Sequence, residues 1–355
     1  MSIYRLAVLV MAACAIAYFM MPHVIKLAHR LGAVDQPDQR KVHNRIMPRL
    51  GGLGIFSAFM IVALLGVPLS GPLEGVMLGA VVVFLVGMLD DIFQLSPYLK
   101  LVGQCGAAAI AIHFGVTVEF LTNPFDGQLN LGWVGVPLTF VWIVGITNAI
   151  NLIDGLDGLA AGVSSIAAAT MGLVAYSQGQ QTVCFLAFIL VAAIAGFLPY
   201  NFNPARTFMG DGGSNFLGYI LACLAVMGLT KTTAVISLFL PIVILGIPIF
   251  DTFFAIIRRI NNRAPIFKPD KAHLHHRLMA IGMSHRRSVL IIYAISTFFG
   301  GVALVLNYLN RPKAALVLAV LLMAIVLGAE KIGMRTGGKG AELVVPRQET
   351  STQHS

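Results

Sequence analysis

Apolar runs of about 16 to 20 residues recur along the 355-residue chain and are too frequent for a water-soluble fold. The mean hydropathy is +0.85, and only 11% of the residues are charged. A helix needs about 20 apolar residues to cross the hydrocarbon core of a bilayer, so the runs predict membrane-spanning helices. We place eleven of them, at roughly 3–22, 50–70, 74–89, 101–115, 136–150, 159–177, 183–200, 214–230, 234–252, 288–308 and 314–331. The predicted fold is all-α, a polytopic integral membrane protein.

The distribution of Lys and Arg predicts the orientation of these helices. Twenty of the 24 lie in the segments 23–49, 90–100, 201–213, 253–287 and 331–355. Loops rich in Lys and Arg stay in the cytoplasm, so we expect these segments to be cytoplasmic. An odd number of spans then puts the N-terminus outside and the C-terminus inside. The prediction is a multi-pass protein of the plasma membrane.

The chain is predicted to form one transmembrane unit, followed by a tail. Residues 1–331 make up the transmembrane catalytic domain, and the polar, Gly-containing segment 332–355 is expected to be a disordered cytoplasmic tail. The first run lacks a small-residue cleavage site, so we expect a retained helix. Segment 116–135 contains turn residues between two short apolar stretches and predicts a hairpin. The predicted cytoplasmic loops of the catalytic domain are 23–49, 90–100, 151–158, 201–213 and 253–287.

Composition also argues against two classes of function. The four cysteines lie singly inside apolar runs, without the spacing of a zinc or redox motif. The formal net charge is +9, but the basic residues are spread between the spans and form no patch with interleaved aromatic residues. We therefore expect no nucleic-acid partner and attribute the charge to topology and anionic substrates.

Six of the 15 acidic residues lie in polar clusters at predicted cytoplasmic helix ends or loops. Ionised groups in or beside a bilayer are costly, so such clusters normally mark a functional site. Adjacent carboxylates repel each other, and a cation or a proton-transfer role would explain them, although a solvated helix end is the alternative. The clusters are Asp90-Asp91, the run from Asn148 to Asp157, Asp211 in a Gly-rich turn, and Asp270 ahead of His273-Leu-His-His-Arg277.

The run from Asn148 to Asp157 repeats a polar residue at every third position. On a continuous helix, steps of three would spread the four side chains over half of the circumference. Gly155 and Gly158 indicate that the helix ends and a loop opens, which would turn the side chains toward one cavity. A simple polar turn is the alternative.

Two further motifs suggest phosphate binding. Glycines flank Asp211, and glycine backbones at a helix N-terminus can approach phosphate closely; a tight turn is the alternative. The His273–Arg277 motif could bind zinc, but no further ligand completes a set, and the adjacent Arg favours phosphate. A basic patch facing anionic lipid head groups is the alternative. In the first cytoplasmic segment, Lys41, His43 and Arg49 either hold a lipid phosphate or only enforce topology.

Taken together, these motifs resemble the polyprenyl-phosphate N-acetylhexosamine-1-phosphate transferases, of the glycosyl transferase 4 type. The resemblance covers about residues 35–280. It rests on Lys41-Val-His43, Asp90-Asp91 with Lys100, Asn148-Ala-Ile-Asn151-Leu-Ile-Asp154-Gly-Leu-Asp157-Gly, Asn201, Phe208-Met-Gly-Asp211 and His273-Leu-His275-His276-Arg277.

The resemblance implies an Mg²⁺ ion, with Mn²⁺ as the alternative, held by Asp211 and Asn151. It implies that the ion bridges the diphosphate of a UDP-sugar. The remaining negative charge would be neutralised by Lys100 and by the histidine motif, that is, His275, His276 and Arg277.

The resemblance also implies the roles of the other motif residues. Asp157 would accept the uracil N–H, Phe208 would stack on the ring, and Asn201 would line the nucleoside pocket. Asp90 would orient or deprotonate the lipid phosphate, and Asp91 and Asp154 would complete the polar cluster. Substrate contacts are also expected from Lys41, His43, Arg49, Asn148 and His273.

The implied reaction transfers N-acetylglucosamine-1-phosphate from UDP-GlcNAc to undecaprenyl phosphate, releases UMP and initiates a bacterial cell-envelope polysaccharide. The His-Leu-His-His-Arg form is similar to the GlcNAc-1-phosphate branch, whereas the branch for muramoyl-pentapeptide usually has three consecutive histidines. UDP-MurNAc-pentapeptide and UDP-GalNAc remain alternative donors. The oligomeric state is open, and a homodimer is compatible with the sequence.

Two other classes are alternatives. A proton-coupled transporter would place carboxylates near the membrane midplane, whereas the acidic residues here lie at predicted helix ends. A membrane metalloprotease would require His-Glu-x-x-His, which the sequence lacks.

Overall fold

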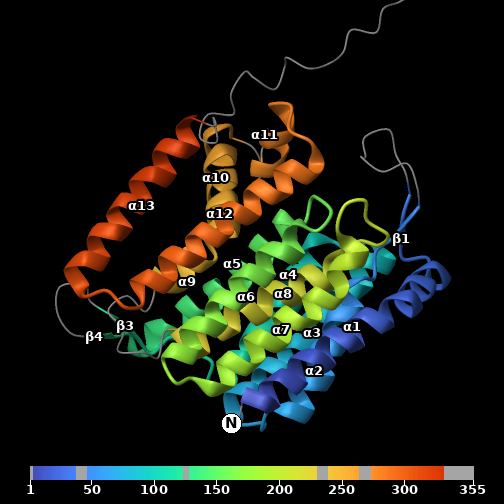
Figure 1. Cartoon of the computed structure of the whole chain (residues 1–355), viewed down its shortest axis with the longest axis horizontal. Coiled ribbons are helices and arrows are strands. Elements are labelled where there is room, and N and C mark those ends of the chain that lie inside the picture. Colours follow the sequence, from blue (N-terminus) through green and yellow to red (C-terminus); the bar gives the residue numbers. More distant parts are fainter. Residues whose placement is uncertain (1–2, 37–45, 123–127, 230–238, 264–272, 332–355) are drawn as a thin grey trace, which may run out of the picture.

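The computed structural model describes residues 3–36, 46–122, 128–229, 239–263 and 273–331, and nearly all of them belong to one helical bundle (Figure 1). Two short helices of other types accompany the α-helices: the 3₁₀ turn η1 (Gly132–Val134) and the π turn η2 (Ala225–Leu229), which extends α8. The α-helices are α1 (Ile3–Leu31), α2 (Gly52–Gly66), α3 (Gly71–Phe93), α4 (Pro97–His113), α5 (Gly135–Ile153), α6 (Leu159–Ser177), α7 (Gln181–Asn201), α8 (Gly210–Leu224), α9 (Phe239–Ile244), α10 (Gly246–Asn261), α11 (Leu274–Ala280), α12 (His285–Leu306) and α13 (Arg311–Lys331).

The predicted apolar runs are helical wherever the structure describes them, with one exception. The run 234–252 is broken at Leu245, where α9 ends and α10 begins, so the prediction of one continuous helix there is wrong. In the described part of the chain, six helical segments are long and apolar enough to cross a membrane: Tyr4–Leu31, Gly71–Phe93, Gly132–Ile153, Leu159–Ser177, Gln181–Asn201 and His285–Leu306. The protein is therefore a multi-pass membrane protein. The count of eleven spans and the orientation stay predictions.

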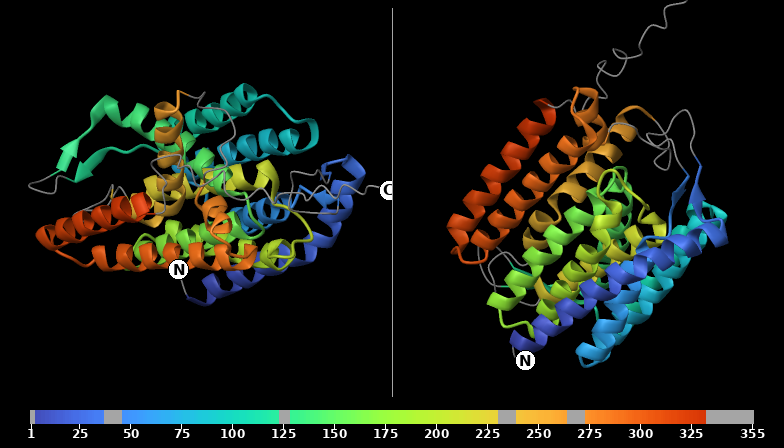
Figure 2. Two further views of the ribbon diagram at one scale, coloured as in Figure 1. Left: turned by 90° about the horizontal axis from the view of Figure 1, so that it is seen from above. Right: turned by 45° about the vertical axis from the view of Figure 1, so that its right-hand side comes forward.

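Helix α8 lies at the centre of the bundle and packs against α3 and α5, while α1 and α6 pack against α7. Every residue of α8 except Asp211 is buried. The helices α12 and α13 lie on one side of the bundle, away from α1 and α2 (Figures 1 and 2). Since α8 is surrounded by protein, groups at its N-terminus are positioned by several helices at once.

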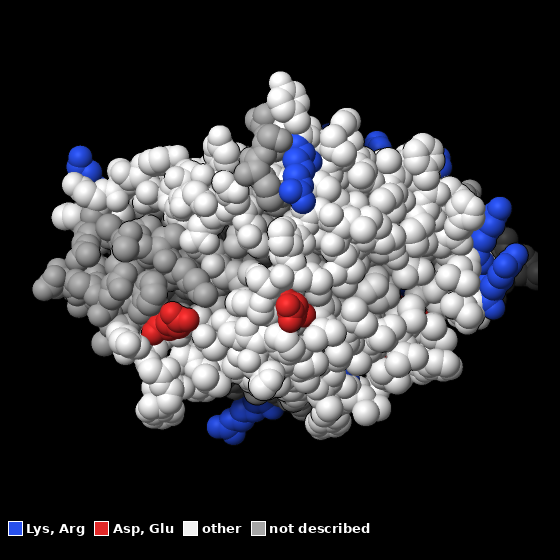
Figure 3. All heavy atoms as spheres, turned by 90° about the horizontal axis from the view of Figure 1, so that it is seen from below, with Lys and Arg blue, Asp and Glu red and all other residues white. Residues whose placement is uncertain are grey.

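The outer surface of the bundle is suited to lipid. Large apolar side chains such as Phe19, Leu65 and Trp133 are exposed. In Figure 3, the face seen from below is almost entirely uncharged, with a few separated Lys, Arg, Asp and Glu. In a membrane this apolar surface contacts hydrocarbon instead of water.

Two pairs of short strands connect the helices. The predicted hairpin in 116–135 is confirmed: β3 (Phe120–Thr122) pairs antiparallel with β4 (Gln128–Asn130), and residues 123–127 lie outside the described part. The second pair was not predicted: β1 (Val34–Asp35) pairs with β2 (Met47–Pro48). This pair places Asp35 and the chain from Pro48 onward beside the start of α8.

Backbone hydrogen bonds join the segment after β2 to the segment before α8. The N–H of Phe208 donates to the carbonyl of Pro48 at 2.8 Å, and the N–H of Gly51 donates to the carbonyl of Phe208 at 3.0 Å. The N–H of Gly52 donates to the carbonyl of Met209 at 2.8 Å. Arg49 is therefore held beside the first turn of α8, about 160 residues away in the sequence.

Candidate active site

Three helix ends bring Asp90, Lys100 and Asp211 together. Helix α3 ends at Phe93, the next residue Gln94 adopts a left-handed conformation (φ 53°), and α4 begins at Pro97. This tight corner folds Lys100 back over Asp90. The ammonium nitrogen of Lys100 lies 3.1 Å from Asp90 Oδ2 and 2.8 Å from Asp211 Oδ2, so one cation links the two carboxylates.

Asp91 holds the first turn of α8 in place. Its two carboxylate oxygens accept hydrogen bonds from the N–H groups of Asp211 (2.9 Å) and Gly212 (3.0 Å). Unpaired N–H groups at a helix start favour a negative partner, and Asp91 provides one from another helix. These two N–H groups are therefore not available to a phosphate, contrary to what the glycine pattern predicted. A Cβ on Gly87 would meet the backbone of Gly212 at 2.6 Å, so this close approach of α3 depends on glycine.

Arg49 adds a second cation to the cluster. Its guanidinium lies 3.6 Å from Asp91 Oδ1 and 3.7 Å from Asp211 Oδ1. Burial by itself raises the pKa of Asp211, but its hydrogen bond with Asp90 and the charges of Lys100 and Arg49 hold that pKa below its usual value. Burial lowers the pKa of Lys100, but Asp211 and Asp90 outweigh it and raise the pKa. Asp211 and Lys100 are therefore both charged at neutral pH.

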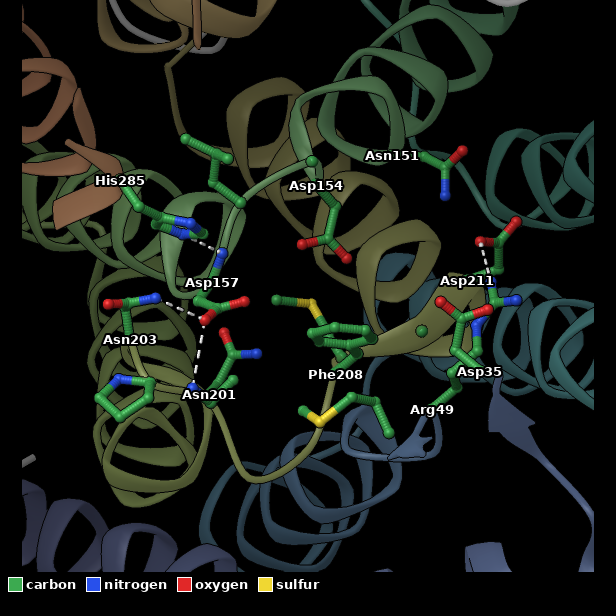
Figure 4. A pocket seen from close by; sticks show the side chains of 17 residues that line it. Asp35, Arg49, Asn151, Asp154, Asp157, Asn201, Asn203, Phe208, Asp211 and His285 are labelled. Carbon is green, nitrogen blue, oxygen red and sulfur yellow. Dashed lines mark hydrogen bonds and ion pairs between the residues drawn. The ribbon is translucent and has the colours of Figure 1, made fainter. Parts of the chain in front are cut away.

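A cleft of about 880 Å³ opens beside this cluster. Figure 4 shows Asp211, Arg49, Asp35 and Asn151 at one end, and Asp157, Asn203 and His285 at the other, with Asp154 and Phe208 between them. Of the predicted site residues, seven line the cleft: Arg49, Asn151, Asp154, Asp157, Asn201, Phe208 and Asp211. Asp90, Asp91 and Lys100 lie behind its charged end, bonded to Asp211.

The run Asn148–Asp157 ends a helix and opens a loop, as the glycines predicted. Helix α5 ends at Ile153, so Asn151 lies on its last turn while Asp154 and Asp157 lie in the loop. Burial raises the pKa of Asp154 to about 7, and the neighbouring charge of Asp211 adds to the effect. Asn148 does not join the cleft, so the prediction of four convergent side chains is wrong for this residue. Its amide nitrogen donates to Gln104 and to the carbonyl of Val144.

The hydrogen-bonding end of the cleft is built around Asp157. Its Oδ2 accepts hydrogen bonds from Asn203 Nδ2 (2.9 Å) and from the N–H of Ala205 (3.1 Å). Its own N–H donates to His285 Nε2 at 2.9 Å, which leaves the ring proton on Nδ1. Asn201 accepts from the N–H of Gly158 and donates to the carbonyl of Thr207, so its amide shapes the loop.

The histidine motif lies outside the residues that line the cleft. His273 is buried and bonds Asp251 at 2.8 Å, and the N–H of Leu274 donates to the same carboxylate. His275 packs behind the turn at Gly155. Burial lowers the pKa of His275 to about 3. His275 is therefore neutral in this structure, and its expected role toward the donor phosphates stays a prediction. His276 and Arg277 are partly exposed on α11, and their expected contact with substrate stays a prediction.

The remaining residues are two predicted ones in the first cytoplasmic segment and three cleft residues that were not predicted. Lys41 and His43 lie outside the described residues, so their roles stay predictions. Asp35, Asn203 and His285 line the cleft without having been predicted. Asp35 is one of two acidic residues in a mostly basic segment, which is a weak signal. His285 precedes two arginines that were attributed to topology.

The residues present are compatible with a hard divalent cation. Among the described residues, no three His, Cys, Asp or Glu side chains gather closely enough to hold a metal by themselves. Such an ion would need amide, phosphate or water oxygens in addition to carboxylate. Asn151 suits this role because its Nδ2 donates to Ser214 Oγ at 2.8 Å, which assigns Nδ2 as the bonded atom and leaves Oδ1 as the acceptor. Oxygen ligands of this kind suit Mg²⁺.

The chain is similar to one family of membrane transferases over most of its length. The sequence profile of glycosyl transferase family 4 matches residues 73–229. The chain is 47% identical, over 88% of each sequence, to the "Probable undecaprenyl-phosphate N-acetylglucosaminyl 1-phosphate transferase" of Bacillus subtilis (strain 168). It is 35% identical to the "Decaprenyl-phosphate N-acetylglucosaminephosphotransferase" of Mycobacterium tuberculosis (strain ATCC 25618 / H37Rv), over 90% of this chain and 87% of the relative.

A more distant relative has a similar name. An "Undecaprenyl-phosphate alpha-N-acetylglucosaminyl 1-phosphate transferase" of Thermotoga maritima is 30% identical over 80% of this chain and 85% of the relative. Together with the cluster of Asp90, Lys100 and Asp211 at the charged end of a cleft in a multi-pass membrane bundle, this similarity over most of the chain shows that the protein belongs to glycosyl transferase family 4.

Proposed function

We propose that this protein transfers N-acetylglucosamine-1-phosphate from UDP-GlcNAc to undecaprenyl phosphate and releases UMP. The product is a lipid-linked diphosphate sugar that initiates a cell-envelope polysaccharide. The reaction would take place at the cytoplasmic face of a bacterial plasma membrane. The observation that carries the proposal is the asymmetric cleft, which has a charged end around Asp211 and a hydrogen-bonding end around Asp157.

The charged end fits the electrostatic problem of the reaction. An oxygen of the lipid phosphate attacks the sugar-bearing phosphorus of the donor, and the bond from that phosphorus to the bridging oxygen breaks, so UMP leaves. Several negative charges meet in this step, and preorganised cations lower such a barrier more than any proton transfer does. Lys100 and Arg49 are fixed cations at this end, each held by two carboxylates.

Asp90 would orient the lipid phosphate through Lys100. A phosphate monoester has its second pKa near 6, so a proton-accepting role for Asp90 would contribute only modestly. A single displacement then needs no covalent intermediate on an aspartate. Asp91 is expected to act by holding α8, because both of its oxygens already bind the helix.

Mg²⁺ is part of the proposal. Asp211 and Asn151 would hold it, and the ion would supply positive charge to the donor diphosphate. In support, both side chains line the charged end of the cleft, and Asn151 has its amide oxygen directed by the bond to Ser214.

The opposite end is proposed to bind the uridine of the donor. Asp157 uses Oδ2 for Asn203 and Ala205, so Oδ1 would accept the uracil N–H. Phe208 lines the middle of the cleft and would stack on the ring. We propose that Asn201 shapes this pocket, since both ends of its amide are used by the backbone.

The test uses purified protein with undecaprenyl phosphate or decaprenyl phosphate and a panel of UDP-sugars, with UMP release as the measurement. We expect turnover with UDP-GlcNAc, little with UDP-GalNAc or UDP-MurNAc-pentapeptide, and loss of turnover in EDTA that Mg²⁺ restores. The Asp211→Asn variant should lose turnover, because the amide keeps the shape but removes the charge. UMP release without the lipid would overturn the proposed reaction. Full activity in EDTA would overturn the proposed Mg²⁺ requirement.

A further inference from the structure

Three amide side chains form a hydrogen-bonded group inside the bundle. Asn148 Nδ2 donates to Gln104 Oε1 at 2.6 Å, and Gln104 Nε2 donates to Asn215 Oδ1 at 3.1 Å. Gln104 Nε2 also lies 3.4 Å from Asn148 Oδ1. Gln104 and Asn215 are only 5% and 3% exposed. We refer to Gln104, Asn148 and Asn215 as the amide triad.

The triad lies one helical turn below the charged end of the cleft. On α4, Gln104 follows Lys100 by four residues, and on α8, Asn215 follows Asp211 by four. On α5, Asn148 precedes Asn151 by three residues. Since an α-helix has 3.6 residues per turn, each amide shares a face with the site residue of its own helix.

This arrangement adds a buried side-chain link between α4 and α8, which are also joined by Lys100 to Asp211 and by the hydroxyl of Tyr219 to the carbonyl of Ala107 at 3.4 Å. Helix α4 packs mainly against α3 and α5, and α8 packs mainly against α3 and α5. The bond from Gln104 to Asn215 is thus a direct connection between α4 and α8, one turn from the bond between Lys100 and Asp211. Hydrogen bonds are directional, and a buried amide without a partner is costly, so the triad favours one rotation of each helix about its axis.

We infer that the amide triad is a positioning device for the transfer reaction, which sets the rotation of α4 and α8 so that Lys100 and Asp211 meet at the cleft. The inference rests on the proposed function for its kinetic consequence. Asn148 then acts through Gln104 and not by touching substrate. A substitution far from the reacting atoms that displaces a catalytic group by about 1 Å can lower the rate about 10²-fold.

The first test is a double-mutant cycle. Gln104→Leu should lower kcat by about tenfold or more. If Gln104 acts by bringing Lys100 to Asp211, the variant that combines Gln104→Leu with Lys100→Met should lose less kcat than the product of the two single losses, because one of the two positioned residues is already gone. Multiplicative losses would overturn the inference. Thr147→Val is the matched control, since Thr147 is buried beside Asn148 and its hydroxyl bonds only the carbonyl of Ile143 within its own helix among the described contacts.

A length exchange keeps the inference testable if Gln104→Leu fails to fold. Gln104→Asn shortens one amide by a methylene, and Asn215→Gln lengthens its partner on α8 by the same amount. We expect Gln104→Asn alone to lower kcat, and the exchanged pair Gln104→Asn with Asn215→Gln to recover most of it. An exchanged pair no faster than Gln104→Asn would overturn the inference.

A readout without activity separates this inference from the proposed function. The N–H groups of Asp211 and Gly212 are held by Asp91, and their hydrogen exchange reports how well the first turn of α8 is seated. We expect faster exchange there in Gln104→Leu than in Thr147→Val. If the wild-type protein released no UMP, the proposed reaction would be wrong, but the exchange rates of the two variants would still test the role of the triad. Equal exchange rates in Gln104→Leu and Thr147→Val would refute that role.

Discussion

Replacing Lys100 by Met should slow the enzyme strongly without removing the side chain's volume. The ammonium lies 2.8 Å from Asp211 and 3.1 Å from Asp90. At an effective dielectric constant of about 20, two unit charges 4 Å apart interact by about 4 kcal/mol, so the ammonium of Lys100 contributes strongly to keeping Asp211 ionised. In the proposed reaction, the same cation would oppose the negative charge of two phosphorylated substrates.

The expected loss follows from comparable fixed donors. Removing one preorganised donor to a charged transition state costs about 2.7–4 kcal/mol, or about 10²–10³ in kcat. Arg49 remains within 3.7 Å of Asp211 and keeps part of the positive charge, so we expect measurable residual turnover instead of none.

The assay is UMP release at saturating undecaprenyl phosphate, with UDP-GlcNAc varied so that kcat and KM are obtained separately. Lys26→Met is the control, because Lys26 is an exposed lysine on α1 outside the cleft, and we expect its kcat to stay near the wild-type value. A Lys100→Met enzyme within about threefold of wild-type kcat would refute the argument from preorganised charge, since the loss of even one such donor should lower kcat by about 10²-fold.

Three further predictions concern stability, measured by thermal unfolding in detergent. Asp91→Asn should lower Tm, because an amide can accept from only one of the two N–H groups of α8 and leaves the other unpaired, at a cost of about 1–3 kcal/mol; an unchanged Tm would contradict this. In EDTA, Asp154→Asn should gain stability relative to wild type as pH rises from about 4 to about 7. The Asp154 carboxyl has a pKa of about 7 when folded and 3.8 when unfolded, so ionisation in this pH range favours the unfolded wild-type chain, whereas Asn does not ionise. A constant Tm difference from about pH 4 to 8 would exclude the raised pKa. Gly158→Ala should lower Tm by a few degrees, because φ is +79° and the new Cβ would lie 3.0 Å from Phe202, with a cost of about 1–2 kcal/mol; wild-type Tm would show that the loop relaxes freely.

The helices were predictable because bilayer burial acts locally along the chain. An apolar run of sufficient length has little alternative to a helix when water cannot satisfy its backbone. The same reasoning failed at Leu245, where a run that is continuous in composition is split into α9 and α10. Apolar composition does not encode where a helix bends, because packing against neighbouring helices decides that.

Part of the site was also predictable, since acidic residues at the ends of apolar helices have few structural reasons to be there. Asn151, Asp154, Asp157 and Asp211 were expected to converge, and they line one cleft. Asn148 belongs to the same periodic run but points to Gln104, because it lies one turn deeper on α5. The spacing of three residues does not predict which polar residues of the run reach the cleft and which stay buried between helices.

The amino-acid sequence alone determined a helical membrane protein, its polar motifs and the family to which they belong, because hydropathy and motif spacing are properties of consecutive residues. Only the tertiary structure decided that Asp91 holds α8, that Asp35 and His285 reach the cleft, and that His275 is buried and neutral. Those outcomes depend on contacts between segments far apart in the chain, where desolvation and hydrogen-bond partners are set by packing.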